Sequence, residues 1–398
     1  EGEEEGEKAG EDAGDIMRSH DIQKHEEYVW AHCISSYPKL EGDPLRQGSP
    51  ICDQFCVHVY ENRTVTALAD GCGWGHASCE AAQKAVDAFM DFMRSKLPTI
   101  RTVRDAGNML LTGVANAHDK IVENKKPDEA SFIGTTTFFG GVLLQLPEAS
   151  SFPAIASSPD QVQVSEAGSS LSVSEAQAAA PASASASADL ADSSLEGGAS
   201  TSSHSPRPPV VQLQASWVYV FASVGDIKGF RYSVHHNKVF PLIASRRQNP
   251  LDPRDSGGRI GPQLFDNSPD LANLSVDYIL CDEGDFVFVT SDGVHDNLDP
   301  QLMGFSPHNL GLNTDDWYDL MDEKEELEVL KSNWACHFLD TQIIGRIHGD
   351  ITAEAIGQAL MKHALALTEA SRTWMETPKH RNDEQPAALE FPGKMDHT

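Results

Sequence analysis

Two residue patterns alternate along most of the chain: short runs of β-branched and aromatic residues, and longer stretches with apolar residues at every third or fourth position. The first pattern predicts β-strands and the second predicts amphipathic helices. Strands are predicted at residues 56–60, 64–69, 136–144, 217–223, 228–234, 238–243 and 286–291, and helices from about 77 and at 101–123, 323–338 and 352–374. Because strands group with strands, we expect an α+β fold in which helices cover antiparallel sheets.

Two segments show neither pattern. Residues 1–27 open with the run EGEEEGEKAGEDAGD, which predicts a disordered acidic tail. Residues 147–209 are rich in Ala, Ser and Pro, which predicts a disordered insertion between the strands at 136–144 and 217–223. The remaining chain, residues 28–398 without the insertion, is predicted to be one domain.

The 398 residues carry 60 Asp and Glu against 30 Lys and Arg, a net charge of −30. Such a field repels phosphate backbones, so we expect no nucleic-acid partner. No apolar run is long enough to predict a membrane span. The seven cysteines lack the spacing of a zinc site, and reduced, buried thiols are the simpler interpretation. A monomer in the cytosol or the nucleus is the default expectation.

Single aspartates recur at the ends of predicted strands, next to glycine: Asp70, Asp226 and Asp292. A strand end places its side chain at the edge of a sheet, and a neighbouring glycine lets a ligand approach the backbone closely. Several carboxylates at one edge favour a hard cation such as Mg²⁺ or Mn²⁺. The alternative for each copy taken alone is an ordinary turn.

The motifs around these aspartates resemble those of the PP2C (PPM-type) metal-dependent serine/threonine protein phosphatases. Five motifs occur in the family's order: Ala69-Asp70-Gly71 with its following glycines, Gly134-Thr135-Thr136, Ser223-Val224-Gly225-Asp226, Ser291-Asp292-Gly293-Val294-x-Asp296-Asn297 and Pro392-Gly393-Lys394-x-Asp396. The resemblance covers about residues 28–398 apart from the insertion. It implies a four-layer αββα sandwich, two antiparallel sheets flanked by helices, and hydrolysis of phosphoserine and phosphothreonine in phosphoprotein substrates.

The resemblance also implies a site with two Mg²⁺ or Mn²⁺ ions and positions for a third. Its implied metal ligands are Asp53, Asp70, the Gly71 carbonyl, Asp226, Asp292, Asp296 and Asp396, of which Asp70, Asp292 and Asp396 are the implied catalytic residues. Arg46 is the nearest candidate for binding the substrate phosphate. Two cations at such a site would activate a water molecule for attack on phosphorus.

Two departures from the family pattern leave an alternative open. Cys52 stands where the family has a glutamate, and a neutral thiol is a poor ligand for Mg²⁺ or Mn²⁺. Cys72 stands where many members have a histidine that assists the leaving group. The sequence therefore also allows a catalytically impaired, phosphatase-like (pseudophosphatase) module that binds a phosphoprotein or a regulatory partner. A third interpretation, an acidic scaffold that recruits partners through its biased segments, depends on no recognisable motif.

Overall fold

The two sheets form because nearly every strand of the chain has at least one face of apolar side chains. The computed structural model describes residues 15–18, 28–124, 133–146, 216–242, 247–263, 267–380 and 391–398. The insertion predicted at 147–209 lies outside these residues. Strand β1 (Asp15–Arg18) falls within the range predicted as an acidic tail, and the other residues of that range, up to 27, are not described.

The larger sheet has six antiparallel strands in the order β1-β2-β3-β4-β5-β8. Its strands after β1 are β2 (Asp53–Tyr60), β3 (Arg63–Gly71), β4 (Thr136–Gln145), β5 (Trp217–Val224) and β8 (Ser275–Cys281). The smaller sheet has the order β7-β6-β9 and consists of β6 (Lys228–Ser233), β7 (Lys238–Pro241) and β9 (Phe286–Thr290). Strands β4 and β5 pair directly, as the predicted hairpin with an enlarged connection requires.

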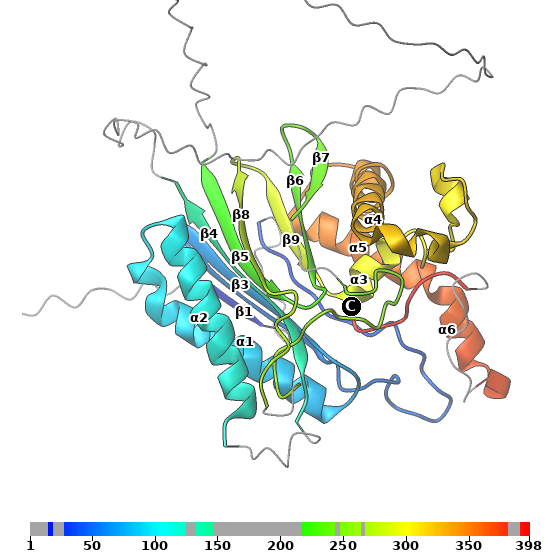
Figure 1. Ribbon diagram of the computed structural model, residues 1–398, viewed down its shortest axis with the longest axis horizontal. Helices are drawn as coiled ribbons and strands as arrows, with labels where there is room; N and C mark the ends of the chain where they lie inside the picture. Colours follow the sequence, from blue (N-terminus) through cyan, green and yellow to red (C-terminus); the bar gives the residue numbers. More distant parts are fainter. Residues whose placement is uncertain are drawn as a thin grey trace, which may run out of the picture. The chain divides into compact units, whose positions relative to one another are not determined.

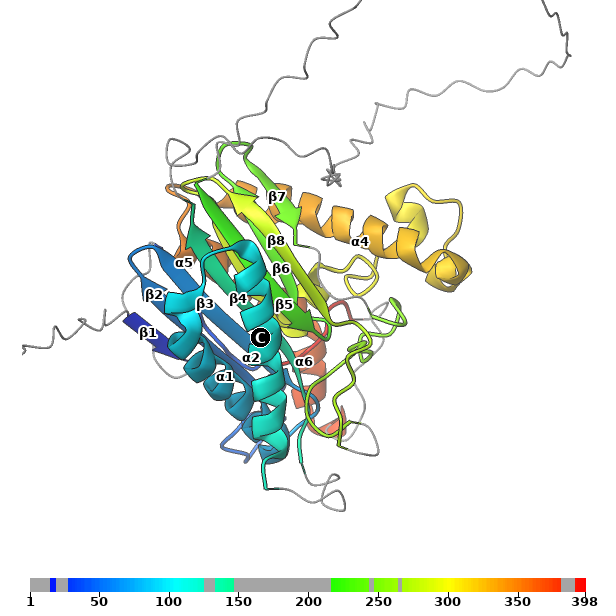
Figure 2. The ribbon, with the colours of Figure 1, turned by 60° about the vertical axis from the view of Figure 1, so that its left-hand side comes forward.

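Helices cover the outer face of each sheet (Figure 1). Helices α1 (His76–Lys96) and α2 (Val103–Val122) pack on the larger sheet, as a second view shows (Figure 2). Helices α4 (Lys324–Phe338) and α5 (Ala353–Leu367) pack on the smaller sheet, and α6 (Glu369–Glu376) follows α5. The predicted four-layer αββα arrangement is confirmed.

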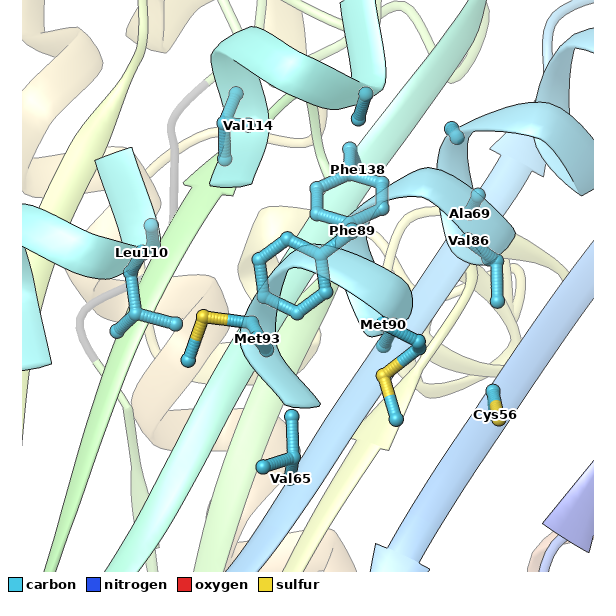
Figure 3. Close-up of a cluster of buried hydrophobic side chains, with 14 of the residues drawn as sticks. Cys56, Val65, Ala69, Val86, Phe89, Met90, Met93, Leu110, Val114 and Phe138 are labelled. Carbon is cyan, nitrogen blue, oxygen red and sulfur yellow. The ribbon is translucent and has the colours of Figure 1, made fainter. Parts of the chain in front are cut away.

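The core beneath α1 holds the larger sheet to its helices. Phe89 of α1 is fully buried, and its ring lies 5.0 Å from that of Phe138 in β4, between Met90, Met93 and Leu110 (Figure 3). The Phe89 ring also needs a small residue beneath it in β4, two positions after Phe138. Gly140 supplies it, because a Cβ atom there would lie 2.4 Å from the Phe89 ring.

Two differences from the predicted elements have local causes. Strand β8 was not predicted, because it is an edge strand in which Asp277 interrupts the apolar run and Val276 and Tyr278 are exposed. The helix predicted at 352–374 is two helices. Its backbone breaks at Thr368, whose hydroxyl donates to the Ala364 carbonyl at 2.8 Å.

Candidate functional site

Strands β2 and β3 place two aspartates opposite each other. Asp53 begins β2, Asp70 lies next to the end of β3, and the two are direct cross-strand partners. Their carboxyl groups interact electrostatically, and the Ser291 hydroxyl donates to Asp53 Oδ2 at 2.7 Å. Asp53 is therefore held inside the protein, with 3% of its surface exposed.

Two turns contribute three more aspartates. Asp226 follows β5 at the turn into β6, after Gly225, whose φ of +103° and contact with Thr137 leave no room for a side chain. Asp292 begins the short helix α3 (Asp292–His295) after β9, and Asp296 follows it. Asp226 and Asp296 are buried, and Asp292 is partly buried.

The C-terminal segment, residues 391–398, brings Asp396 to the same place beside α3 (Figure 1). Gly293 permits this approach, because a Cβ atom there would lie 1.8 Å from the His397 carbonyl oxygen. The Tyr37 hydroxyl donates to Asp396 Oδ1 at 2.9 Å. The structure thus brings together all six predicted carboxylates, as their mutual electrostatic interactions also indicate.

Two cations that were not predicted lie among these carboxylates. Lys394 Nζ donates to Asp292 Oδ2 and lies 2.9 Å from Asp396 Oδ2 and 3.2 Å from Asp296 Oδ2. The Arg247 guanidinium donates to Asp226 Oδ2 at 2.6 Å and to both carboxylate oxygens of Asp296 at 2.9 Å. Lys394 could have been predicted to lie near the cluster, since it stands two residues before Asp396 in the same motif. Arg247 carried no comparable signal.

The electrostatics divide the cluster into two parts. Burial alone would raise the pKa of Asp296, but Arg247 and Lys394 hold that pKa well below its ordinary value. Burial and the neighbouring Asp396 raise the pKa of Asp53 to about 7, although the Ser291 hydroxyl and Lys394 act in the opposite direction. Burial, Asp53 and Asp292 raise the pKa of Asp70. Burial also raises the pKa of Asp292 despite its contact with Lys394, so the two cations compensate Asp296 more fully than they compensate the other carboxyl groups.

Gly71, Cys52 and Cys72 line the same region. The Gly71 amide donates to the Cys52 carbonyl at 3.3 Å, and a Cβ atom at Gly71 would lie 2.6 Å from the Ser78 carbonyl oxygen. Burial and the nearby Cys79 raise the pKa of the Cys52 thiol to about 12, and burial raises that of Cys72. Both thiols are therefore protonated at neutral pH, which makes them poor metal ligands.

Arg46, the candidate for binding phosphate, is an exposed residue. Its guanidinium donates to the Tyr37 carbonyl at 2.7 Å and lies 3.8 Å from a carboxylate oxygen of Glu376. Tyr37 in turn contacts Asp396 through its hydroxyl. Arg46 is thus connected to the cluster through Tyr37, and its role in binding phosphate stays a prediction.

The residues present do not fit the binuclear divalent centre that the family resemblance implies. Mg²⁺ requires carboxylate oxygens at about 2.0–2.1 Å. The Oδ2 atoms of Asp292 and Asp396 instead face the Lys394 ammonium group. In the described part of the chain, no three His, Cys, Asp or Glu side chains are arranged to hold a metal ion. Likewise, no helix among these residues is long and apolar enough to cross a membrane.

Known proteins support the family resemblance. The chain is 34% identical over 111 residues to the PP2C-like domain-containing protein CG9801 of Drosophila melanogaster. The match covers 28% of this chain and 16% of the relative, so the chain spans about a sixth of the length of the curated relative that it matches. No family model matches the chain.

Solved structures similar to this chain include two phosphatases. One is the photosystem II phosphatase PBCP, with 13% identity, a TM-score of 0.41 and coverage of 96% of both chains. The other is the serine/threonine phosphatase PstP/Ppp of Mycobacterium tuberculosis, with 14% identity, a TM-score of 0.35 and coverage of 88% of this chain and 92% of that chain.

Proposed function

Because the chain is PP2C-like in sequence and in its αββα arrangement, we propose that it is a phosphatase-like module that binds a partner protein without hydrolysing phosphoesters. The observation that carries this proposal is the position of Lys394 Nζ, which contacts Asp292, Asp396 and Asp296. A side-chain ammonium group neutralises carboxylates, but it cannot activate a water molecule as a divalent ion does.

The charge of the cluster favours a particular kind of partner. Six aspartates against Lys394 and Arg247 leave at most four uncompensated negative charges, and the raised pKa values of Asp53, Asp70 and Asp292 reduce that number at neutral pH. A phosphoryl group would be repelled by this field, whereas lysine and arginine side chains would be attracted. The proposed partner therefore presents basic side chains to this face.

Metal-dependent hydrolysis of phosphoserine or phosphothreonine is the second candidate function, and one observation favours it. Burial and neighbouring carboxyl groups raise the pKa values of Asp53 and Asp70, so the ionised forms of both residues would gain from a nearby cation. A Mg²⁺ or Mn²⁺ ion beside this pair would stabilise both ionised carboxylates. Hydrolysis would also require the ammonium group of Lys394 to leave Asp292 and Asp396.

Phosphate release from a phosphothreonine peptide, titrated with Mn²⁺ and with Mg²⁺, separates the two functions. We expect the wild type to release no more phosphate than an Asp292→Asn variant at any metal concentration. Metal-dependent release that Asp292→Asn abolishes would establish the hydrolase instead. Binding is measured with a fluorescent basic peptide, with and without a phosphothreonine. We expect the phosphate to weaken binding, and tighter binding of the phosphorylated peptide would contradict the proposed partner.

A further inference from the structure

We infer that Lys394 and Arg247 take the structural place of divalent ions in this cluster, and that Lys394 is the residue that excludes such an ion. The inference deepens the proposed function and rests on it, because a hydrolytic wild type would need the ions that Lys394 excludes. It makes a stronger claim, since it predicts that one substitution opens the cluster to a divalent ion.

Lys394 competes directly for the oxygens that an ion would use. Its Nζ atom contacts the Oδ2 atoms of Asp292, Asp296 and Asp396, which come from two separate segments of the chain. An ion bound to Asp292 and Asp396 would lie about 2.1 Å from their oxygens. It would then be within a few ångströms of the ammonium group, and the two positive charges would repel each other.

The backbone fixes Lys394 in this position. Its amide donates to Asn297 Oδ1 at 2.9 Å, and Asn297 Nδ2 donates back to the Lys394 carbonyl at the same distance. Asn297 follows Asp296 directly, so the pair of hydrogen bonds ties the lysine to the turn that carries one of its carboxylates. Withdrawal of Lys394 from the cluster would leave Asp396 without its cation, and Asp292 and Asp296 with Arg247 alone.

Arg247 is the second cation that contacts Asp296. Its guanidinium bridges Asp226 and Asp296, and its side chain is only 6% exposed. Asp296 thus contacts both cations, while Asp292 and Asp396 depend on Lys394. Removal of Lys394 alone leaves Arg247 in place and frees oxygens of Asp292 and Asp396, next to Asp70. Asp292, Asp396 and the nearby Asp70 would then have to move closer together to hold Mn²⁺ or Mg²⁺, because no three such side chains of the described residues are arranged around an ion.

A second buried lysine provides a matched control. Lys331 is 4% exposed, and its Nζ lies 3.1 Å from Asp299 Oδ2 and donates to the Pro250 carbonyl. Its substitution also breaks a buried ion pair, but around a single carboxylate. A divalent ion should therefore not compensate for the loss of Lys331.

The test measures the melting temperature and Mn²⁺ binding by calorimetry for five proteins: the wild type, Lys394→Ser, Asp396→Asn, the double variant Lys394→Ser with Asp396→Asn, and Lys331→Met. After treatment with EDTA, we expect Lys394→Ser to melt below the wild type. Saturating Mn²⁺ should raise its melting temperature by about 5 °C. The wild type, the double variant and Lys331→Met should show no saturable response, which also controls for weak binding of Mn²⁺ to the acidic surface.

Three results would overturn the inference. If folded Lys394→Ser responds to Mn²⁺ no more than the double variant does, Lys394 is not what excludes the ion, and the proposed function is unaffected. If Lys394→Ser folds neither in EDTA nor in Mn²⁺, an ion cannot replace the ammonium group. If the wild type binds Mn²⁺ and Asp396→Asn abolishes that binding, both the inference and the premise of the proposed function are wrong.

Discussion

Replacement of Arg247 by methionine should strongly destabilise this protein. The guanidinium makes hydrogen bonds to Asp226 and Asp296, and all three side chains are at least 94% buried. Methionine fills a similar volume but leaves both carboxylates without this partner. The guanidinium also lies 4.0 Å from Asp292, so a third carboxylate loses part of its compensation.

The expected loss follows from the cost of an unpaired buried charge. Removal of one partner from a buried ion pair costs roughly 3–5 kcal/mol, which corresponds to a fall in melting temperature of about 6–20 °C. The matched control is Arg254→Met, because Arg254 is 87% exposed and pairs with Asp252 at the surface. An exposed pair of this kind contributes about 0–1 kcal/mol.

Urea unfolding at several pH values is the appropriate assay. In the wild type, Arg247 and Lys394 hold the pKa of Asp296 below its ordinary value despite burial. The stability from this ionised group is present at neutral pH and is lost as the pH falls through the lowered pKa. The difference between Arg247→Met and the wild type should therefore be full at neutral pH and shrink below about pH 4, as Asp296 of the wild type becomes protonated. A loss no larger than that of Arg254→Met would refute the reasoning, since the cluster would then not depend on Arg247.

Three further changes have expected outcomes. Burial raises the pKa of Asp53 to about 7, so the cost of ionising it in the folded protein grows as the pH rises from about 4 and is complete above about pH 7. In urea unfolding, Asp53→Asn should therefore stabilise the protein by at most about 4 kcal/mol at pH 8 and by much less at pH 5. Destabilisation at pH 8 would instead show that the carboxylate has a cation partner. Gly140→Val should cost about 1–3 kcal/mol, because its side chain would overlap the buried Phe89 ring, and an unchanged melting temperature would contradict this packing. Thr102→Ala should cost about 0.5–2 kcal/mol by thermal unfolding, because it removes the capping box with Asp105 at the start of α2, whereas Thr112→Ala within α2 serves as its control.

The sequence was sufficient for most of the fold, because the elements that carry it have clear local signals. Helix α2 begins at a capping box and keeps an apolar face along its length. Strands β4 and β5 are nearly all buried, and their residues are β-branched or aromatic over most of their length. The local sequence pattern does not identify the edge strand β8, because this strand is half exposed and Asp277 interrupts its apolar residues. Its strand conformation depends on its pairing with β5.

For the candidate site, the sequence determined which carboxylates converge. Asp70, Asp226 and Asp292 each follow or end a strand beside glycine, and a sheet necessarily gathers such ends along its edges. The resemblance of the motifs to those of the PP2C family then implied Asp53, Asp296 and Asp396 as further members of one acidic cluster. Composition and spacing could not say what neutralises that cluster, because charge compensation depends on distances in space.

Only the tertiary structure brought the cations into the cluster. Lys394 reaches Asp292 across 102 positions in the sequence, and Arg247 reaches Asp296 across 49. An aspartate beside glycine at a strand end is visible in the sequence as a candidate ligand, although each copy alone is also compatible with an ordinary turn. A lysine can be identified as the substitute for a metal ion only when its ammonium group lies within hydrogen-bonding distance of several carboxylates. The strength of that interaction depends on distance and burial, and not on position along the chain.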